Sequence, residues 1–166
     1  MAEFDPVAIL RALDAHRVEF LVVGGIAARL RGAPLLTQAV DITPATDRAN
    51  LERLAAALRD LEARLRTATE PNGAPFPFDA GLLGNATVWT LITKHGDLDL
   101  VVSPAGTDGY RDLIKDSDEL KVATEPDLAV QVASLADVIR SKEAAGREKD
   151  RAALPLLRKT LDESTR

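Results

Sequence analysis

Residues 18–44, VEFLVVGGIAARLRGAPLLTQAVDITP, decide the class of fold. The opening run VEFLVV is apolar and rich in β-branched side chains, which predicts a buried strand. Gly24 and Gly25 end that strand, and residues 26–32 predict a short helix. Residues 37–42 have the length and composition of a second strand. Two strands joined through a glycine turn and a helix indicate an α/β protein.

Helical signals lie on both sides of this stretch. Asp5 before Pro6 predicts a helix that ends near His16. A leucine stripe predicts a long helix capped by Thr46 or Asp47. Its members follow one another three and four residues apart: Leu51, Leu54, Leu58, Leu61 and Leu65. One leucine face cannot be buried alone, so this helix needs a sheet to pack on.

Two hairpins are expected to complete the sheet. Residues 86–93 and 97–103 flank a short turn, and residues 119–123 and 128–133 form the second pair. Residues 68–86 are rich in proline and glycine and predict a long loop. The expected fold class is therefore α/β (α+β), with a mixed sheet built from hairpins and flanked by helices.

We expect a single domain over residues 1–166, with residues 134–166 as a C-terminal helical segment. Ser134 is predicted to cap the first helix of this segment. Gly146 is predicted to interrupt it, and Pro155 to kink or break the last helix.

Composition excludes several classes of protein. The chain has no cysteine, so it holds no disulfide, thiolate nucleophile or cysteine-ligated zinc. Its two histidines cannot build a three-histidine metal site. No apolar run approaches the roughly 18 residues that span a bilayer, and the acidic N-terminus lacks the basic region of a signal peptide. We therefore expect a cytoplasmic protein with no membrane partner.

Three acids and the glycine turn are candidates for chemistry. Gly24 and Gly25 would let backbone amides approach a phosphate, although a tight turn alone also explains such a pair. Asp41 lies in an apolar strand, where a lone buried carboxylate is costly unless it is paired. Asp97 and Asp99 share one face of a later strand. If the two strands are neighbours, Asp41 and Asp99 would meet and hold Mg²⁺. Taken alone, each acid is equally explained as a strand-end residue that reaches water.

Together these residues resemble the signature of the nucleotidyltransferase superfamily, a glycine turn followed by an Asp-x-Asp strand and a third aspartate. The segments VVGGIAARLRGAP, VDITP, HGDLDL and SLADVIRSKEAAGREKDRAALPLL are similar to AbiEii/MenT-like nucleotidyltransferase toxins of toxin–antitoxin systems. The similarity extends over residues 8–160. It implies a Mg²⁺-dependent enzyme that transfers a nucleotidyl group from an NTP to the 3′ end of tRNA and so blocks translation. It also implies a cognate antitoxin as a protein partner.

The resemblance assigns roles to single positions. Gly24 and Gly25 match the turn that holds the triphosphate. Asp41 matches the second acid of the Asp-x-Asp motif, and Asp99 matches the third acid, with Asp97 as the alternative register. These acids are the implied metal ligands, and Asp41 and Asp99 are also implied catalytic residues.

Basic residues near the C-terminus complete the implied site. Lys142 matches a basic catalytic and nucleotide-binding residue, although a solvated helix lysine is the alternative reading. Lys149 and Asp150 match a basic–acidic pair that opens the last helix and contacts the nucleotide.

One position departs from the pattern. The first acid of the Asp-x-Asp motif falls at residue 39, which is Ala39, while its neighbours Gln38 and Val40 keep the pattern. Alanine cannot ligate a metal ion. A single change within an intact motif favours an inactivating Asp→Ala substitution over gradual decay, so we expect this chain to be catalytically impaired.

Alternatives to the tRNA acceptor stay open. The chain would be a non-catalytic nucleotide- or partner-binding module if Ala39 is natural. As an enzyme, it would alternatively modify a small molecule such as an aminoglycoside, or a protein. Residues 140–166 carry eight bases against five acids, which is a modest positive charge for binding RNA.

Overall fold

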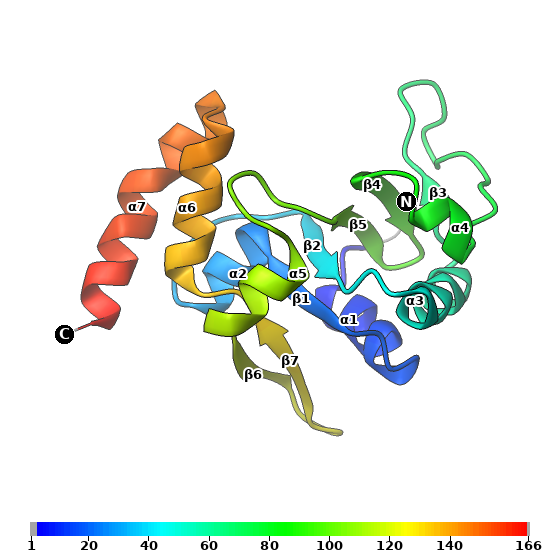
Figure 1. Cartoon of the computed structure of the whole chain (residues 1–166), viewed down its shortest axis with the longest axis horizontal. Coiled ribbons are helices and arrows are strands. Elements are labelled where there is room, and N and C mark those ends of the chain that lie inside the picture. Colours follow the sequence, from blue (N-terminus) through cyan, green and yellow to red (C-terminus); the bar gives the residue numbers. More distant parts are fainter. Residues whose placement is uncertain (1–2, 166) are drawn as a thin grey trace.

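The computed structural model describes residues 3–165. A seven-stranded mixed sheet runs through this part of the chain in the order β3-β4-β5-β2-β1-β7-β6 (Figure 1). The strands are β1 (Phe20–Val23), β2 (Ala39–Pro44), β3 (Arg64–Leu65), β4 (Val88–Thr93), β5 (Gly96–Val101), β6 (Asp118–Ala123) and β7 (Leu128–Val132).

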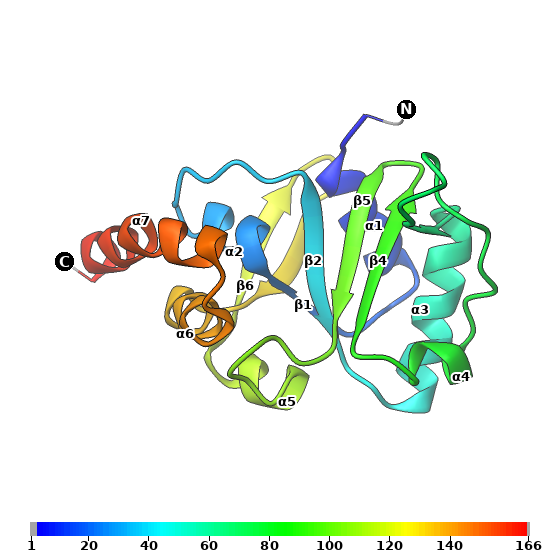
Figure 2. The same cartoon turned by 90° about the horizontal axis from the view of Figure 1, so that it is seen from above.

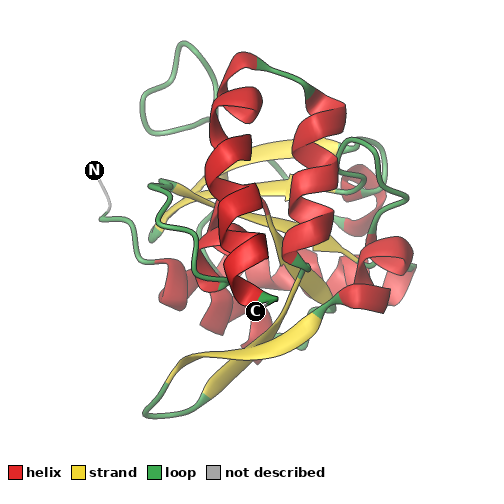
Figure 3. Cartoon of the chain, turned by 90° about the vertical axis from the view of Figure 1, so that its left-hand side faces the viewer, coloured by secondary structure: helices red, strands yellow, loops and turns green. Residues whose placement is uncertain are grey.

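Strand pairing explains why the sheet is mixed. β4–β5 and β6–β7 are antiparallel hairpins, as predicted, and β3 extends the first of them. β1 is antiparallel to β2 and parallel to β7, whereas β2 is parallel to β5. The β6–β7 hairpin projects beyond the helices at one end of the molecule (Figure 3). The expected α+β class with a mixed, hairpin-built sheet is confirmed.

Helices cover both faces of the sheet (Figure 2). On one face, α1 contacts β2, β5 and β7 and packs beside α3. On the other face, α2 contacts β1, β2 and α6, and α7 packs on α6. The helices are α1 (Pro6–Ala15), α2 (Gly24–Leu30), α3 (Arg48–Asp60), α4 (Ala80–Leu83), α5 (Tyr110–Leu113) with the 3-10 turn η1 (Ile114–Asp116), α6 (Leu135–Ala145) and α7 (Glu148–Ser164).

Alternation along the two central strands separates the core from the acids. Val40 and Ile42 of β2 lie opposite Leu98 and Leu100 of β5, and all four side chains are buried. Burying each such side chain stabilises the fold by about 1.5–3 kcal/mol. The residues between them, which include Asp41, therefore point to the opposite face.

Helix ends follow the predicted local signals. Asp5 accepts a hydrogen bond from the Ala8 amide at 3.0 Å, and Asp47 rather than Thr46 caps α3. Ser134 Oγ accepts from the Asp137 amide at 3.0 Å and so caps α6. Gly146 ends α6 in the left-handed conformation, with φ of 61°.

Three expectations for helices need correction. The predicted break at Pro155 is wrong, because α7 runs through it and the buried Leu154 and Leu157 hold the helix against the rest of the fold. The leucine stripe stops before Leu65, since α3 ends at Asp60 and Glu62 turns the chain with φ of 53°. The expected long loop over residues 68–86 contains the short helix α4.

None of the helices in residues 3–165 is both long enough and apolar enough to cross a bilayer.

Candidate active site

Two acids meet at the centre of the sheet. The parallel register of β2 and β5 sets Asp41 opposite Asp99 and Ala39 opposite Asp97. The Asp41 and Asp99 side chains are close enough for each to shift the pKa of the other. The predicted contact of Asp41 with Asp99 across adjacent strands is therefore confirmed, whereas their catalytic role stays a prediction.

Gly24 lies directly against this acidic pair. It has φ of 64°, and a Cβ added there would overlap Asp41 Oδ2. Gly25 faces elsewhere, because a Cβ at that position would lie 3.2 Å from the Thr37 side chain. Of the predicted glycine pair, Gly24 alone lines the cavity described next.

A cavity of about 520 Å³ lies between the sheet and the α6–α7 helix pair. Ala39, Gly25 and Asp97 are not part of its lining. The other sequence-predicted site residues all line it: Gly24, Asp41, Asp99, Lys142, Lys149 and Asp150.

Both acids of the pair have raised pKa values. Burial raises the pKa of Asp41 to about 7, and the charge of Asp99 acts in the same direction. Lys142 and Lys149 oppose that rise in part. Burial also raises the pKa of Asp99, against the lowering effect of the Arg66 guanidinium. Two carboxylates this close do not both ionise readily, so they share a proton unless a cation joins them.

Arg66 is a site residue that the sequence did not single out. Its Nη2 lies 3.1 Å from Asp99 Oδ1 and 3.3 Å from Asp97 Oδ2, and its side chain lines the cavity. The chain reaches this place because β3 pairs with β4, and the Arg66 amide then donates to the Thr90 carbonyl at 2.9 Å. An arginine just after a two-residue strand carries no periodic signal that sequence reasoning could use.

Asp150 organises the basic side of the cavity. Its side chain is only 1% exposed and lies 3.3 Å from Lys142 Nζ and 2.7 Å from Arg147 Nε. Burial raises the pKa of Asp150, but hydrogen bonds from Arg147 and Lys142 outweigh it and leave the pKa below its usual value. Asp150 therefore remains an anion that fixes the Lys142 ammonium beside the cavity. Lys142 is not the solvated lysine of the alternative reading.

The donors present suit one divalent ion. Among residues 3–165, no three histidine or acidic side chains are grouped closely enough to hold a metal ion by themselves. Asp41 and Asp99 nevertheless offer hard oxygen ligands, and Mg²⁺ is commonly bound by one or two carboxylates plus substrate phosphates. The residues therefore fit a Mg²⁺ whose shell a substrate completes.

Comparison with known proteins supports the assignment of the fold. No family model matches the chain, and no curated protein sequence matches it. The lincosamide antibiotic adenylyltransferase LnuA, in its lincomycin-bound structure, matches with a TM-score of 0.60 at 14% identity, covering 94% of this chain and 98% of LnuA. The antibiotic-resistance factor ANT(2″)-Ia, in complex with adenylyl-2″-tobramycin, matches with a TM-score of 0.55 at 16% identity, covering 92% and 85%.

A protein of Thermotoga maritima that carries a provisional nucleotidyltransferase assignment matches with a TM-score of 0.55 at 17% identity, covering 98% of this chain and 97% of that one. At such low identities the likeness concerns the fold alone. This chain has the nucleotidyltransferase fold.

Proposed function

We propose that this protein is a nucleotidyltransferase, which moves a nucleotidyl group from an NTP to an acceptor hydroxyl. The observation that carries the proposal is the pairing of Asp41 with Asp99 beside Gly24, in a cavity whose opposite wall carries Lys142 and Lys149. Acids that bind a cation and lysines that bind phosphates are the two requirements of this chemistry.

Each residue would have a definite task. Lys142 and Lys149 would bind the triphosphate, and Asp150 would keep Lys142 in place. Asp41 and Asp99 would hold Mg²⁺, which activates the attacking hydroxyl and neutralises charge on the pyrophosphate. Asp99 lies opposite Thr90 of β4, so we propose that the acceptor enters along the β4 side.

Ala39 would explain a lack of activity in this chain. An aspartate at position 39 would lie opposite Asp97 and on the same face as Asp41. We propose that alanine here removes a metal ligand while leaving the strand intact, because alanine packs easily between strands.

The acceptor proposed first is the 3′ end of tRNA, with a cognate antitoxin as a protein partner and the cytoplasm as the location. The motif resemblance and the net positive charge of residues 140–166 support this acceptor. A small molecule is the second candidate, because LnuA was captured with lincomycin and ANT(2″)-Ia with a tobramycin adduct.

The test is to restore the acid and follow transfer. An Ala39→Asp protein is incubated with Mg²⁺ and each α-labelled NTP, with tRNA, an aminoglycoside, a lincosamide or cell protein as acceptor. Label transfer that disappears in an Ala39→Asp/Asp41→Asn protein supports the proposal, and the labelled acceptor identifies its class. If a folded Ala39→Asp protein binds NTP but labels no acceptor, the enzyme proposal fails and a non-catalytic binding module becomes the favoured function.

A further inference from the structure

We propose that Asp137 binds the nucleobase of the NTP and selects a base with an amino group where adenine has its 6-amino group and cytosine its 4-amino group. This inference rests on the proposed function, because it assumes that a nucleotide occupies the cavity. It concerns a residue to which the resemblance assigned no role and which the proposed metal chemistry does not use.

Asp137 lines the cavity and carries a carboxylate oxygen without a partner among the described residues. The residue is only 9% exposed and belongs to the cavity lining. Its Oδ1 lies 3.1 Å from Arg140 Nη2, whereas its Oδ2 is buried and has no hydrogen-bond partner among residues 3–165. Buried carboxylate oxygens are rarely left unpartnered, since desolvation is then uncompensated. A ligand with a hydrogen-bond donor would satisfy this oxygen.

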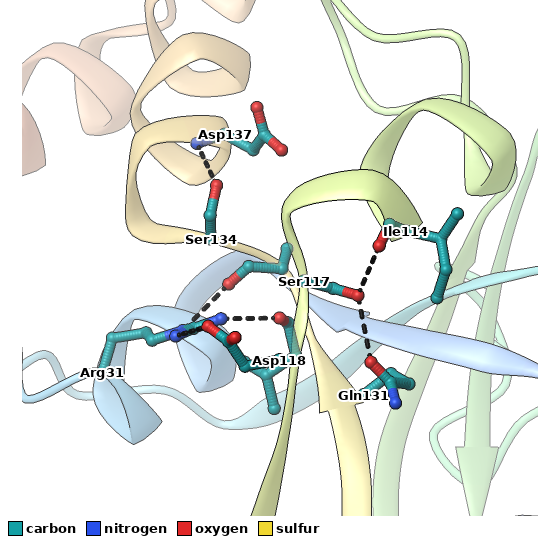
Figure 4. A network of polar contacts seen from close by, with 9 residues as sticks. Arg31, Ile114, Ser117, Asp118, Gln131, Ser134 and Asp137 are labelled. Carbon is teal, nitrogen blue, oxygen red and sulfur yellow. Dashed lines mark hydrogen bonds and ion pairs between the residues drawn. The ribbon is translucent and has the colours of Figure 1, made fainter.

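The local structure fixes the direction of this carboxylate. The Asp137 amide donates to Ser134 Oγ, so the residue lies in the first turn of α6, and Figure 4 shows its carboxylate projecting away from Ser134. Arg140 binds both Asp137 and Asp112, at 3.1 and 3.0 Å, which ties α6 to the α5 segment. The free oxygen is therefore held in place before any ligand arrives.

The negative charge of Asp137 determines which part of a nucleotide would lie beside it. A carboxylate repels phosphates, so the triphosphate belongs near Lys142, five residues further along α6 and about 7.5 Å away along the axis. A ribose separates the base from the phosphates of a nucleotide, which brings the base back toward Asp137.

The surroundings of Asp137 also suit a base. Apolar residues that line the cavity with it, Leu113, Pro104 and Val138, provide walls for the faces of a planar ring. Ser141 lines the cavity one turn after Asp137 and offers a second hydrogen-bonding group. The acceptor would approach from the far side, beside Asp99 and Thr90.

The chemistry of the free oxygen predicts the preference. The 6-amino group of adenine and the 4-amino group of cytosine donate hydrogen bonds to a carboxylate. Hypoxanthine and uracil present a carbonyl oxygen at the same position, which repels it. ATP and CTP should therefore bind more tightly than ITP and UTP, respectively, by about tenfold or more.

The experiment measures affinity in this chain by calorimetry, with ATP against ITP and CTP against UTP as matched pairs and Mg²⁺ present. Asp137→Asn replaces an acceptor by an amide that donates to a carbonyl, so it should abolish or reverse both preferences. Asp112→Asn is the control, because Asp112 also binds Arg140 but does not line the cavity, and both preferences should persist.

Each affinity ratio is taken within one protein, so a partial loss of folding in a variant does not disturb it. An unchanged ATP:ITP and CTP:UTP preference in Asp137→Asn would overturn the role of Asp137 while leaving the proposed function intact. If this chain and its Ala39→Asp form bind none of the four nucleotides, the proposed function fails and this inference fails with it.

Discussion

Asp41 should make the free energy of unfolding depend on pH. Burial and Asp99 raise its pKa from 3.8 to about 7, whereas aspartate in an unfolded chain titrates near 3.9. Folding therefore favours the protonated form between these values. The contribution of Asp41 to the free energy of unfolding should be full below about pH 4, fall as the pH rises to about 7 and stay constant above it.

Urea unfolding in the presence of a chelator, from about pH 4 to about pH 8, measures this decline, and Asp41→Asn should flatten it. Asp112→Asn is the contrasting variant. A hydrogen bond from the Asp108 backbone amide lowers the pKa of Asp112. Removing the Asp112 carboxylate should therefore leave the decline of the free energy of unfolding above about pH 4 unchanged. An undiminished slope in Asp41→Asn would show that another group is responsible.

Gly24 is the position where a side chain should do most harm near the acids. Gly24→Ala combines a left-handed backbone with overlap of Asp41 Oδ2, so it should lower the free energy of unfolding by about 1–3 kcal/mol. Gly81→Ala serves as the control, because the nearest atom to its new Cβ is Asp79 Oδ1 at 3.4 Å. Equal urea midpoints for the two variants would contradict the strain at Gly24.

Which site residues the sequence predicts depends on how local their signal is. Strand parity was enough to place Asp97 and Asp99 on one face, but only the register of β2 with β5 shows that Asp99 is the acid opposite Asp41. The sequence did not predict Arg66 as a site residue, because its position depends on the pairing of β3 with β4. Ser134 was predicted as a cap, but the unpartnered oxygen of Asp137 in the same turn becomes apparent only when α6 is packed over the sheet.

Local signals likewise decide which elements the sequence predicts. The caps at Asp5, Asp47 and Ser134 are each satisfied within three residues, so no distant contact is needed to predict them. The four-residue helices α4 and α5 are too short to show an apolar period, and the sequence did not reveal them. Pro155 wrongly predicted a break in the last helix. Packing of α7 overrides the strong preference of proline against helix interiors.

Pro155 should therefore cost stability in its present place. It is exposed inside α7, where it removes one helical hydrogen bond and clashes with the preceding turn. Pro155→Ala should raise the free energy of unfolding by about 1–3 kcal/mol, seen as a higher melting temperature. Lys159→Ala, at an exposed position of the same helix, should change it by less than about 0.5 kcal/mol. A Pro155→Ala protein that melts no higher would show that α7 has adapted fully to the proline.

On the scale of the whole molecule, the site is made by strand order. β2 and β5 are neighbours in the sheet although α3, β3, α4 and β4 lie between them in the chain. α6 and α7 then lie at the end of the molecule opposite α3 and α4 (Figure 1). The class of fold follows from local patterns, but this order depends on long-range pairing that a single sequence does not encode in any local period.

A bound nucleotide should therefore stabilise the molecule as a bridge between the sheet and α7. A Mg²⁺–NTP analogue that cannot be cleaved, at about 100 times its Kd, should stabilise the Ala39→Asp protein by about 2.7 kcal/mol. Lys149 lines the cavity near the start of α7, so Lys149→Ala should reduce this ligand-dependent rise in melting temperature. Lys159, ten residues later on the same helix, does not line it, and Lys159→Ala should leave the rise intact.

The pair of lysine variants separates specific phosphate binding from a general effect of charge. Both substitutions remove one positive charge from α7, so screening and net charge change equally. If the two variants lose the same share of the stabilisation, the nucleotide is held by the overall field of the helix rather than at the cavity. If only Lys149→Ala loses it, the phosphates lie between the start of α7 and Asp41, as the proposed reaction requires.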